Sequence, residues 1–530
     1  MCLTHSCFAG VQQWFPCQPE DHPLNASVLL QDLSLSRFTR IFRKSFTADT
    51  LISLGGAGLA RLVAFASMAA ITRLYAPDDY GTWVVLLALA GFFLPFATLR
   101  YDIALVIAPT RRIAAALFMA VVAFTLVMSA LAIFCLVVAP GRVLEVVTGL
   151  SSEQSGWLVL VPCVLVLLSC HLMLQSWLTR ERQFGALSAT QLLQALVTAA
   201  ATLLLPLALG ANAGAAASGA IVGLVSAIFF MAWCARPHLF EAAGRRRLDI
   251  PARHGLRRYK VYPLYMVPYS LSAGVTERIL QLALAGSYSL GVLGAFYVAR
   301  QVVTAPSALL SQALRQVVLA YGAQLDERAR LRERVTRVLQ LLVEVLAPAL
   351  AFGIVWLEAF VYTALGDHWP HLAEFAWWIM FVAATILLTG WLDRIFDVLG
   401  QQQVGVVMQV VSDLVLIGIA LSGPRIGLDA VGLVAALSIV GMLTNFVRLV
   451  VVLRLLGSIW QEIGTLIFRL ASWTAVLTLF QYAISRTGTG LIGMAAGTVF
   501  LAVSLAPVIK SSFDLLWPPV SPQPAPTASS

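Results

Sequence analysis

The sequence predicts an all-α membrane protein that crosses the bilayer about fourteen times, and three observations support this prediction. First, 59% of the 530 residues are hydrophobic and only 12% are charged, with a mean hydropathy of +0.85, far from soluble averages. Second, the apolar residues fall in separate runs of about 20 residues, the length that crosses roughly 30 Å of hydrocarbon as a helix. Third, positive charge collects in alternate short loops between these runs, as the positive-inside rule expects.

The predicted spans follow one another along the whole chain. They lie near residues 50–72, 82–107, 113–139, 157–178, 187–209, 214–235, 263–286, 291–316, 335–357, 372–397, 404–421, 429–453, 465–484 and 489–509. An even number of spans in each half leaves both halves in the same orientation, so we expect two parallel six-helix lobes plus two extra C-terminal helices. The predicted segments are an N-terminal tail that is disordered in part (1–47), an N-lobe (48–235), a basic inter-lobe linker (236–262), a C-lobe (263–455), the two extra helices (456–510) and a disordered tail (511–530).

Short correspondences between the two halves support an internal repeat. The second predicted span opens with Gly81-Thr82-Trp83, and the eighth opens with Gly294-Ala295-Phe296. Arg61 in the first span has a counterpart in Arg278 of the seventh. Substrate paths in such paired repeats lie between the two halves.

The distribution of basic residues predicts the orientation. The loops 210–213 and 287–290 have no positive charge, and residues 358–371 carry acids and histidines but no Lys or Arg. The alternate loops hold Arg37, Arg40, Arg43, Lys44, Arg111, Arg112, Arg180, Arg182, Arg245, Arg246, Arg247, Arg253, Arg257, Arg258, Lys260, Arg328, Arg330, Arg332, Arg334 and Arg337. We therefore expect both termini to be cytoplasmic. Residues 1–36 show no signal-peptide pattern, so the first span is expected to act as the insertion signal.

Several charged side chains lie within the predicted spans. Arg61 sits near the middle of the first span, behind Gly55, Gly56 and Gly58. A charge at this depth costs about 2.5–3.5 kcal/mol on insertion scales, so it should face other protein or a water-filled cavity. The sequence therefore predicts a cationic interior that handles an anion, although close helix packing would also explain the glycines.

The seventh span has the clearest polar stripe. Ser270, Gly274, Glu277 and Gln281 recur at helical spacing and share one face, with Arg278 about 100° away. We interpret this face as a cavity wall that Gln281 lines, where Arg278 meets an anion and Glu277 tunes it. The alternative is a structural ion pair with another helix.

Other spans supply further candidates. In the twelfth span Asn445 and Arg448 share a face that would line the cavity, although Arg448 is also placed to snorkel toward the cytoplasm. Arg300, in the outer half of the eighth span, is a candidate exit-side anion contact. Arg100 and Asp102 are two residues apart, so in one helix they point to different sides and should not pair. Arg100 is a candidate anion contact, and Asp102 and Glu277 are candidates for energy coupling.

Some residues suggest chemistry that their context does not favour. Asp78-Asp79 resembles a metal-binding pair for a sugar nucleotide, but its place before a span favours helix capping. The spacing of Cys2, Cys7 and Cys17 matches no standard zinc pattern, so we expect no metal. No catalytic constellation or Walker-type phosphate loop occurs, so we expect neither an enzyme nor a cofactor. The net charge of +9 follows the loops and does not predict nucleic-acid binding.

Several motifs resemble Wzx-type polysaccharide flippases of the multidrug/oligosaccharidyl-lipid/polysaccharide exporter superfamily, over roughly residues 48–510. They are residues 72–81 (TRLYAPDDYG), 99–104 (LRYDIA), 177–184 (WLTRERQF), 259–265 (YKVYPLY) and 398–402 (VLGQQ). The resemblance implies a two-lobe, V-shaped bundle in the bacterial cytoplasmic (inner) membrane. This bundle would move undecaprenyl-diphosphate-linked oligosaccharide (O-antigen, capsule or exopolysaccharide units) to the periplasmic leaflet, with Arg61 and Arg278 in the cationic cavity. Polysaccharide polymerase and export machinery are candidate partners. The long N-terminal tail departs from the family's short start and leaves the initiator methionine open.

Rival functions make different demands on the sequence. A cation-coupled drug exporter should carry intramembrane acids in the first lobe, where Arg61 stands instead. A peptidoglycan-precursor flippase also needs a cationic cavity and is left open. The sequence lacks the catalytic loops that a membrane-bound glycan enzyme needs. A role as a non-transporting scaffold would leave the intramembrane arginines unexplained.

Overall fold

A computed structural model describes most of the chain. The described residues are 35–108, 110–138, 141, 145, 148–151, 154–243, 259, 263–264, 267–322, 328–399, 401–457, 460–487 and 491–516. The chain divides into two compact units, Met1–Leu51 and Ile52–Ser530. Helix α2 begins in the first unit, and the second unit holds all the helices that follow. Cys2, Cys7, Cys17, the C-terminal tail from residue 517 and most of the predicted linker lie outside the described residues.

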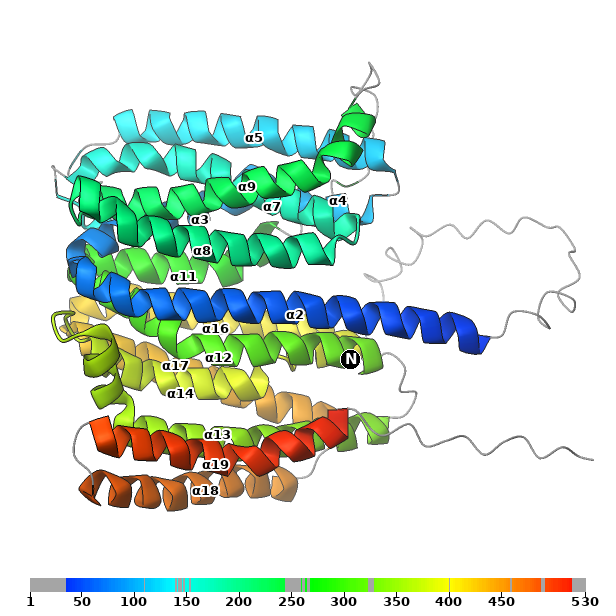
Figure 1. Cartoon of the computed structure of the whole chain (residues 1–530), viewed down its shortest axis with the longest axis vertical. Coiled ribbons are helices and arrows are strands. Elements are labelled where there is room, and N and C mark those ends of the chain that lie inside the picture. The colour runs from blue at the N-terminus through cyan, green and yellow to red at the C-terminus, as the bar shows by residue number, and fades with distance from the viewer. Residues whose placement is uncertain are drawn as a thin grey trace, which may run out of the picture. The chain divides into compact units, whose positions relative to one another are not determined.

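The described part of the chain is helical and contains no strand (Figure 1). Its elements are α2 (Leu35–Leu74), α3 (Pro77–Thr98), α4 (Tyr101–Ile107), α5 (Arg111–Val138), η2 (Gln154–Val159), α7 (Leu160–Arg180), α8 (Phe184–Leu209), α9 (Ala213–Ala243), α11 (Val267–Ser287), α12 (Leu290–Gly322), α13 (Arg328–Leu365), α14 (Leu372–Thr389), α15 (Asp393–Val398), α16 (Gln402–Ser422), η4 (Pro424–Ile426), α17 (Ala430–Leu455), α18 (Trp460–Thr487) and α19 (Leu491–Leu516). Each predicted span coincides with one of the long helices, so the prediction of an all-α polytopic membrane protein is confirmed.

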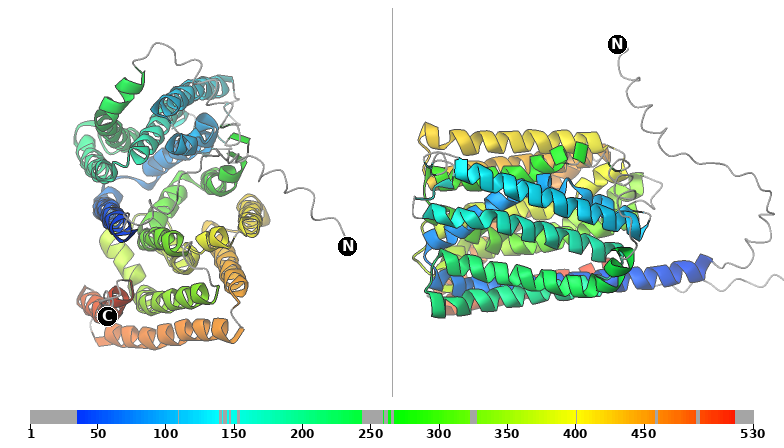
Figure 2. Two further views of the ribbon diagram at one scale, coloured as in Figure 1. Left: turned by 90° about the vertical axis from the view of Figure 1, so that its right-hand side faces the viewer. Right: turned by 90° about the horizontal axis from the view of Figure 1, so that it is seen from above.

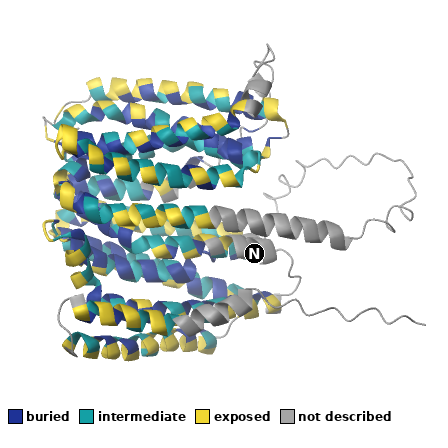
Figure 3. Ribbon diagram, viewed as in Figure 1, coloured by how far each residue is buried: buried dark blue, intermediate teal, exposed yellow. Residues whose placement is uncertain are grey.

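Twelve helices in the described residues are long and apolar enough to cross a membrane. The predicted count of about fourteen is reached with α11, which carries Glu277 and Arg278, and α19, which has an apolar stretch at Ile492–Leu505. Large apolar side chains such as Val137 and Leu207 are exposed on the helices (Figure 3). Such exposure is unfavourable in water and suits contact with lipid.

Two predicted spans are broken near one end. The second span divides into α3 and α4 because Leu99 and Arg100 both adopt a left-handed conformation, with φ of 48° and 56°. Each such residue costs about 1–2 kcal/mol, so the break must be stabilised by its surroundings. The tenth span divides into α14 and α15, and at this break Arg315 donates to the Gly390 carbonyl oxygen at 2.5 Å.

The helices of the second unit pack as two groups. The first half comprises α3 to α9, and the second half comprises α11 to α17, with α18 and α19 packed against α13. Helix α2 from Ile52 onward contacts both halves. Within each half, neighbouring helices pack closely, as α7 does with α3, α5 and α9. Most of these helices appear end-on in the left view of Figure 2. The two halves contact each other chiefly through α3, which packs against both α11 and α12.

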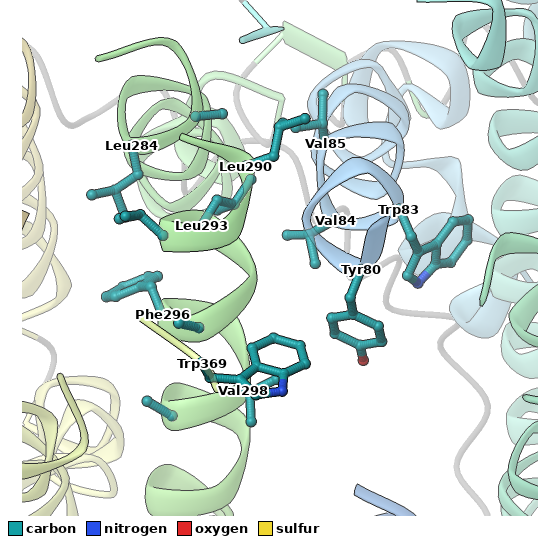
Figure 4. Close-up of a cluster of buried hydrophobic side chains, with 14 of the residues drawn as sticks. Tyr80, Trp83, Val84, Val85, Leu284, Leu290, Leu293, Phe296, Val298 and Trp369 are labelled. Carbon is teal, nitrogen blue, oxygen red and sulfur yellow. The ribbon is translucent and has the colours of Figure 1, made fainter. Parts of the chain in front are cut away.

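Buried side chains form one shared core, two separate cores and a small cluster of Ala347, Ala351 and Leu477. The shared core includes Tyr80 and Trp83 of α3, Leu293 and Phe296 of α12, and Trp369 before α14 (Figure 4). It lies mainly at the Pro77 end, the end of the bundle where α2 finishes and both α3 and α12 begin. At the opposite end, one core contains only residues of the first half and its linker, 101–259, and another contains only residues from 331 onward. The halves are thus joined at the Pro77 end and have independent cores at the opposite end.

Candidate functional site

The two halves meet at the Pro77 end through a reciprocal glycine contact. A Cβ on Gly294 of α12 would lie 2.6 Å from the Pro77 carbonyl oxygen, and a Cβ on Gly81 of α3 would overlap the Leu290 carbonyl. Each glycine is the fifth residue of its helix and faces the first residue of the other. We call this arrangement the Pro77 contact. It confirms the correspondence between Gly81 and Gly294 that the sequence suggested, and it has the symmetry expected of parallel repeats.

Asp78 and Asp79 cap helices other than their own. Asp78 Oδ1 accepts from the Gly291 N–H of α12 at 2.7 Å, and Asp79 Oδ1 accepts from the Ala213 N–H of α9 at 3.1 Å. The two aspartates therefore do act as caps, but the expectation that they cap the span that follows them is wrong: α3 has no side-chain cap, and the capped N–H groups belong to distant elements. Because Asp78 lies in the first half and Gly291 in the second, this cap also joins the halves. A carboxylate at a helix N-terminus is favoured by the unpaired N–H groups and the helix dipole.

The end of α2 is bonded to both halves. Tyr75 donates its hydroxyl to the Thr202 carbonyl of α8 at 2.8 Å, whereas the Trp369 indole N–H donates to the Thr72 carbonyl at 2.6 Å. Arg73 donates to the Thr363 carbonyl of α13 at 2.5 Å. These bonds surround the Pro77 contact and close the same end of the bundle.

Below this closed end, α11 and α12 bring together a set of polar side chains that we call the Glu277 cluster. Its members are Glu277, Arg278 and Gln281 of α11 with Tyr297, Arg300 and Gln301 of α12. Glu277 Oε2 lies 3.4 Å from Arg300 Nη2, and these side chains are 37% and 36% exposed. Gln301 donates from Nε2 to the Tyr297 hydroxyl at 2.8 Å.

Arg278 reaches from the second half toward the first. Its Nη1 donates to Gln281 Oε1 at 3.0 Å, and its Nε lies 2.7 Å from where a Cβ of Gly91 on α3 would stand. Gly91 therefore provides the space that the guanidinium occupies. Gln281 is fully buried, and its Nε2 has no hydrogen-bond partner among the described residues. In this conformation Gln281 holds Arg278 and does not line an open cavity.

The Glu277 cluster lies near the middle of the span. Arg300 is ten residues beyond the start of α12, and Glu277 is ten residues before the end of α11. At 1.5 Å per residue both lie about 15 Å from the Pro77 end, which is half of a hydrocarbon core of roughly 30 Å. Charges at this depth are found where they bind substrate or pair with one another.

Helix α2 contacts both halves with opposite faces. A Cβ on Gly56 would overlap a serine of α8, while Phe65 stacks on Phe360 of α13 with 6.4 Å between ring centroids. Gly56 and Phe65 are nine residues apart, so at 100° per residue they point in opposite directions. From Ile52 onward the helix therefore lies between the halves (Figure 2).

Arg61 lies four residues before Phe65, about 40° away around α2, and so shares the side of the helix that contacts α13. Leu59 and Arg61 are both exposed and lie about 160° apart around the helix. Leu59 lies on the opposite side of the helix, nearer to Gly56. Among the described residues Arg61 has no hydrogen-bond or ion-pair partner.

The expectation that Arg100 and Asp102 do not pair is wrong. Arg100 Nη1 lies 3.6 Å from Asp102 Oδ2, because the break at Leu99 and Arg100 removes the helical geometry that would have separated them. Asp102 is buried, and its Oδ1 has no hydrogen-bond partner among the described residues. The pair lies beyond the end of α3, about 35 Å from the Pro77 end, and is therefore far from the Glu277 cluster.

The candidates of the twelfth span bond within the second half. Arg448 donates to Gln409 Oε1 of α16 at 2.8 Å, and Gln409 donates to both oxygens of the buried Asp413. Asn445 donates to the Thr385 hydroxyl of α14 at 3.1 Å. The structure thus brings Arg278, Arg300, Glu277 and Gln281 together, and it places Arg448 and Asn445 in a separate polar network.

Sequence reasoning did not select Gly91, Tyr297 or Gln301. In the eighth span Tyr297 lies three residues before Arg300 and four before Gln301, so a search for polar stripes there would have found them. Gly91 carries no such signal. Its role depends on the packing of α3 against α11, which only the tertiary structure provides.

These features define a class of protein: a multi-pass helical membrane protein whose two repeated halves meet at one end above a charged site. The structure is similar to the Lipid II flippase MurJ in an inward closed conformation, with a TM-score of 0.65, 12% identity and coverage of 89% of this chain and 100% of that chain. It is also similar to an inward-facing multidrug resistance MATE family transporter of the MOP superfamily, with a TM-score of 0.53, 14% identity and coverage of 76% and 94%. The fold is therefore that of the MurJ and MATE transporters.

The family follows from the sequence match. The family model described as "Polysaccharide biosynthesis protein" matches residues 70–374, more than half of the chain. The chain belongs to this polysaccharide biosynthesis protein family, which together with the fold confirms the resemblance to polysaccharide flippases of the exporter superfamily. No curated protein matches the chain.

Proposed function

We propose that this protein moves undecaprenyl-diphosphate-linked oligosaccharide units across the bacterial cytoplasmic membrane by alternating access. The observation that carries the proposal is the position of Arg278 and Arg300, two guanidinium groups near mid-span where the two halves adjoin. A diphosphate carries about two negative charges, and guanidinium binds phosphate oxygens bidentately. Membership of the polysaccharide biosynthesis family supports the choice of a glycan cargo.

The packing of the two halves supports the transport cycle. With both termini cytoplasmic, the Pro77 end faces the periplasm, and the shared core there closes that side. The separate cores at the opposite end allow the halves to part toward the cytoplasm. The diphosphate would enter from the cytoplasmic side, and the prenyl chain would remain in lipid.

Arg61 completes the proposed cationic lining from α2. An exposed guanidinium that has no partner among the described residues, on the side of α2 that carries Phe65, fits a water-filled passage between the halves. The alternative of a peptidoglycan-precursor flippase requires the same lining, so the cargo must be decided by transport of defined substrates.

The test measures transport of a fluorescent undecaprenyl-diphosphate oligosaccharide by the full chain in liposomes. In cells it measures the display of surface glycan. Arg61→Ala, Arg278→Ala and Arg300→Ala should each reduce transport about 10- to 100-fold, because hydrogen bonds to charged groups contribute about 1.5–3 kcal/mol. Arg425→Ala removes an exposed arginine of η4 and should transport normally. The proposal is overturned if Arg61→Ala, Arg278→Ala and Arg300→Ala all transport normally. Transport of a peptidoglycan precursor in place of the oligosaccharide would instead establish the alternative.

A further inference from the structure

We infer that Glu277 is an exchangeable counter-ion, which neutralises Arg300 while the site is empty and gives way to the diphosphate of the substrate. This inference rests on the proposed function and assigns Glu277 a defined part in it. It differs from a role as a fixed structural partner, in which the Glu277–Arg300 ion pair would persist when the substrate binds.

The ion pair is loosely made and accessible. Its shortest N–O distance of 3.4 Å exceeds the 2.7–2.9 Å that is typical of a charge-assisted hydrogen bond. More than a third of each side chain is exposed. An exposed pair of this kind is worth about 0.2–1 kcal/mol, so a competing anion displaces the carboxylate at small cost.

Arg278 and Arg300 are held in different ways. Arg278 donates to the neutral and fully buried Gln281 and fills the space over Gly91. The group that holds Arg278 in place by this hydrogen bond is therefore uncharged. Arg300 is paired with an acid instead. The site therefore combines one anchored guanidinium with one whose partner can leave.

The depth of the site explains why a removable acid is needed. An uncompensated arginine near the middle of the bilayer is costly, and Glu277 compensates Arg300 when no substrate is present. The charges of Arg278, Arg300 and Glu277 sum to about +1 in the empty site. A diphosphate with about two negative charges brings this sum to about −1, so its repulsion with Glu277 favours ejection of the carboxylate.

Open space lies beside the acid. Gly274 stands about one helical turn before Glu277 on α11, is exposed, and would meet nothing within 4 Å if it carried a Cβ. The Glu277 side chain can therefore turn away from Arg300 toward this space without displacing a neighbouring helix. The exchange needs only a change of side-chain rotamer.

The experiment measures binding of farnesyl diphosphate to the full chain in nanodiscs, together with transport of the lipid-linked oligosaccharide. Glu277→Gln keeps the shape and removes the charge, so diphosphate should bind about two- to five-fold tighter, as expected from the loss of an exposed ion pair. In an Arg300→Gln background the same substitution should tighten binding less, because only the direct repulsion between Glu277 and the diphosphate is then removed. The tighter complex should also lower both the apparent KM and the turnover rate, which a structural role would not do.

Each outcome has a separate meaning. Equal or weaker binding by Glu277→Gln, or a gain that is undiminished with Arg300→Gln, overturns the inference while the proposed function stands. Failure of the wild-type chain to bind the diphosphate, with Arg278→Ala transporting normally, overturns both. If Glu277→Gln does not fold, Glu277→Asp serves in its place, because the shorter side chain keeps the charge and lengthens the contact with Arg300. The Glu277→Asp variant should bind farnesyl diphosphate more tightly than wild type.

Discussion

Replacing Gly81 by alanine should open the Pro77 contact and shift the protein away from the conformation closed at that end. A Cβ at this position would lie 2.6 Å from the Leu290 carbonyl carbon, and nearer still to its oxygen. Carbon atoms in contact prefer about 3.5–4.0 Å, so α3 and α12 would have to separate by about 1 Å. Both obstructing atoms belong to the backbone, which cannot move aside as a side chain can.

The size of the effect follows from overpacking. Inserting a methyl group into a close contact typically costs about 1–3 kcal/mol. If the cost falls only on the closed conformation, the ratio of closed to open molecules should drop about 5- to 150-fold. The substitution also improves helix propensity by about 1 kcal/mol, but this gain applies to both conformations and leaves their ratio unchanged.

The assay is a spin-label distance measurement across the Pro77 end. Labels at Ala211, between α8 and α9, and at Arg425 of η4 are exposed and lie on different halves; the seven cysteines are replaced beforehand. Gly81→Ala should move the population toward longer distances. Gly418→Ala is the matched control, since a Cβ there meets nothing within 4 Å, and it should leave the distances unchanged. An unchanged distribution in Gly81→Ala, with the protein folded, would refute the reasoning.

Two further predictions concern residues that act across the halves. Gly91→Ala should displace the Arg278 guanidinium and weaken farnesyl diphosphate binding about ten-fold. Thermal stability should change little, because the new Cβ meets the end of a flexible side chain. A large fall in the melting temperature with unchanged binding would contradict this prediction. Asp78→Ala should remove the cap of α12, costing about 0.5–2 kcal/mol, and lengthen the same spin-label distance. Asp429→Ala removes a cap within α17 alone and should lower stability without changing that distance, so identical behaviour of the two variants would count against an inter-half role for Asp78.

The sequence located the helices because lipid imposes a simple requirement on composition. Any segment that crosses the bilayer must be apolar over about 20 residues, and this constraint acts locally along the chain. Each of the fourteen predicted spans corresponds to a long helix, or to a long and a short helix, of the described residues, and the charged residues within the spans were identified as well. The sequence did not predict the break at Leu99 and Arg100, because neither residue is a glycine or proline that would have indicated a left-handed conformation or a helix end. The error about Arg100 and Asp102 followed directly from that unbroken helix.

The partners of the charged residues were decided by tertiary structure. The stripe on the seventh span placed Glu277, Arg278 and Gln281 on neighbouring faces, but nothing in it showed that Glu277 pairs with Arg300 of the next helix. The aspartates before the second span looked like caps, yet the helices they cap begin at Ala213 and at Leu290.

The sequence by itself therefore determined which segments enter the membrane and which polar groups they carry there. Only the tertiary structure decided that Gly81 and Gly294 close one end and that Gly91 receives Arg278. The physical reason is that hydrophobicity and helix periodicity are properties of a single segment. An ion pair, a helix cap or a close approach of two backbones depends on the distance between segments that are far apart in the chain.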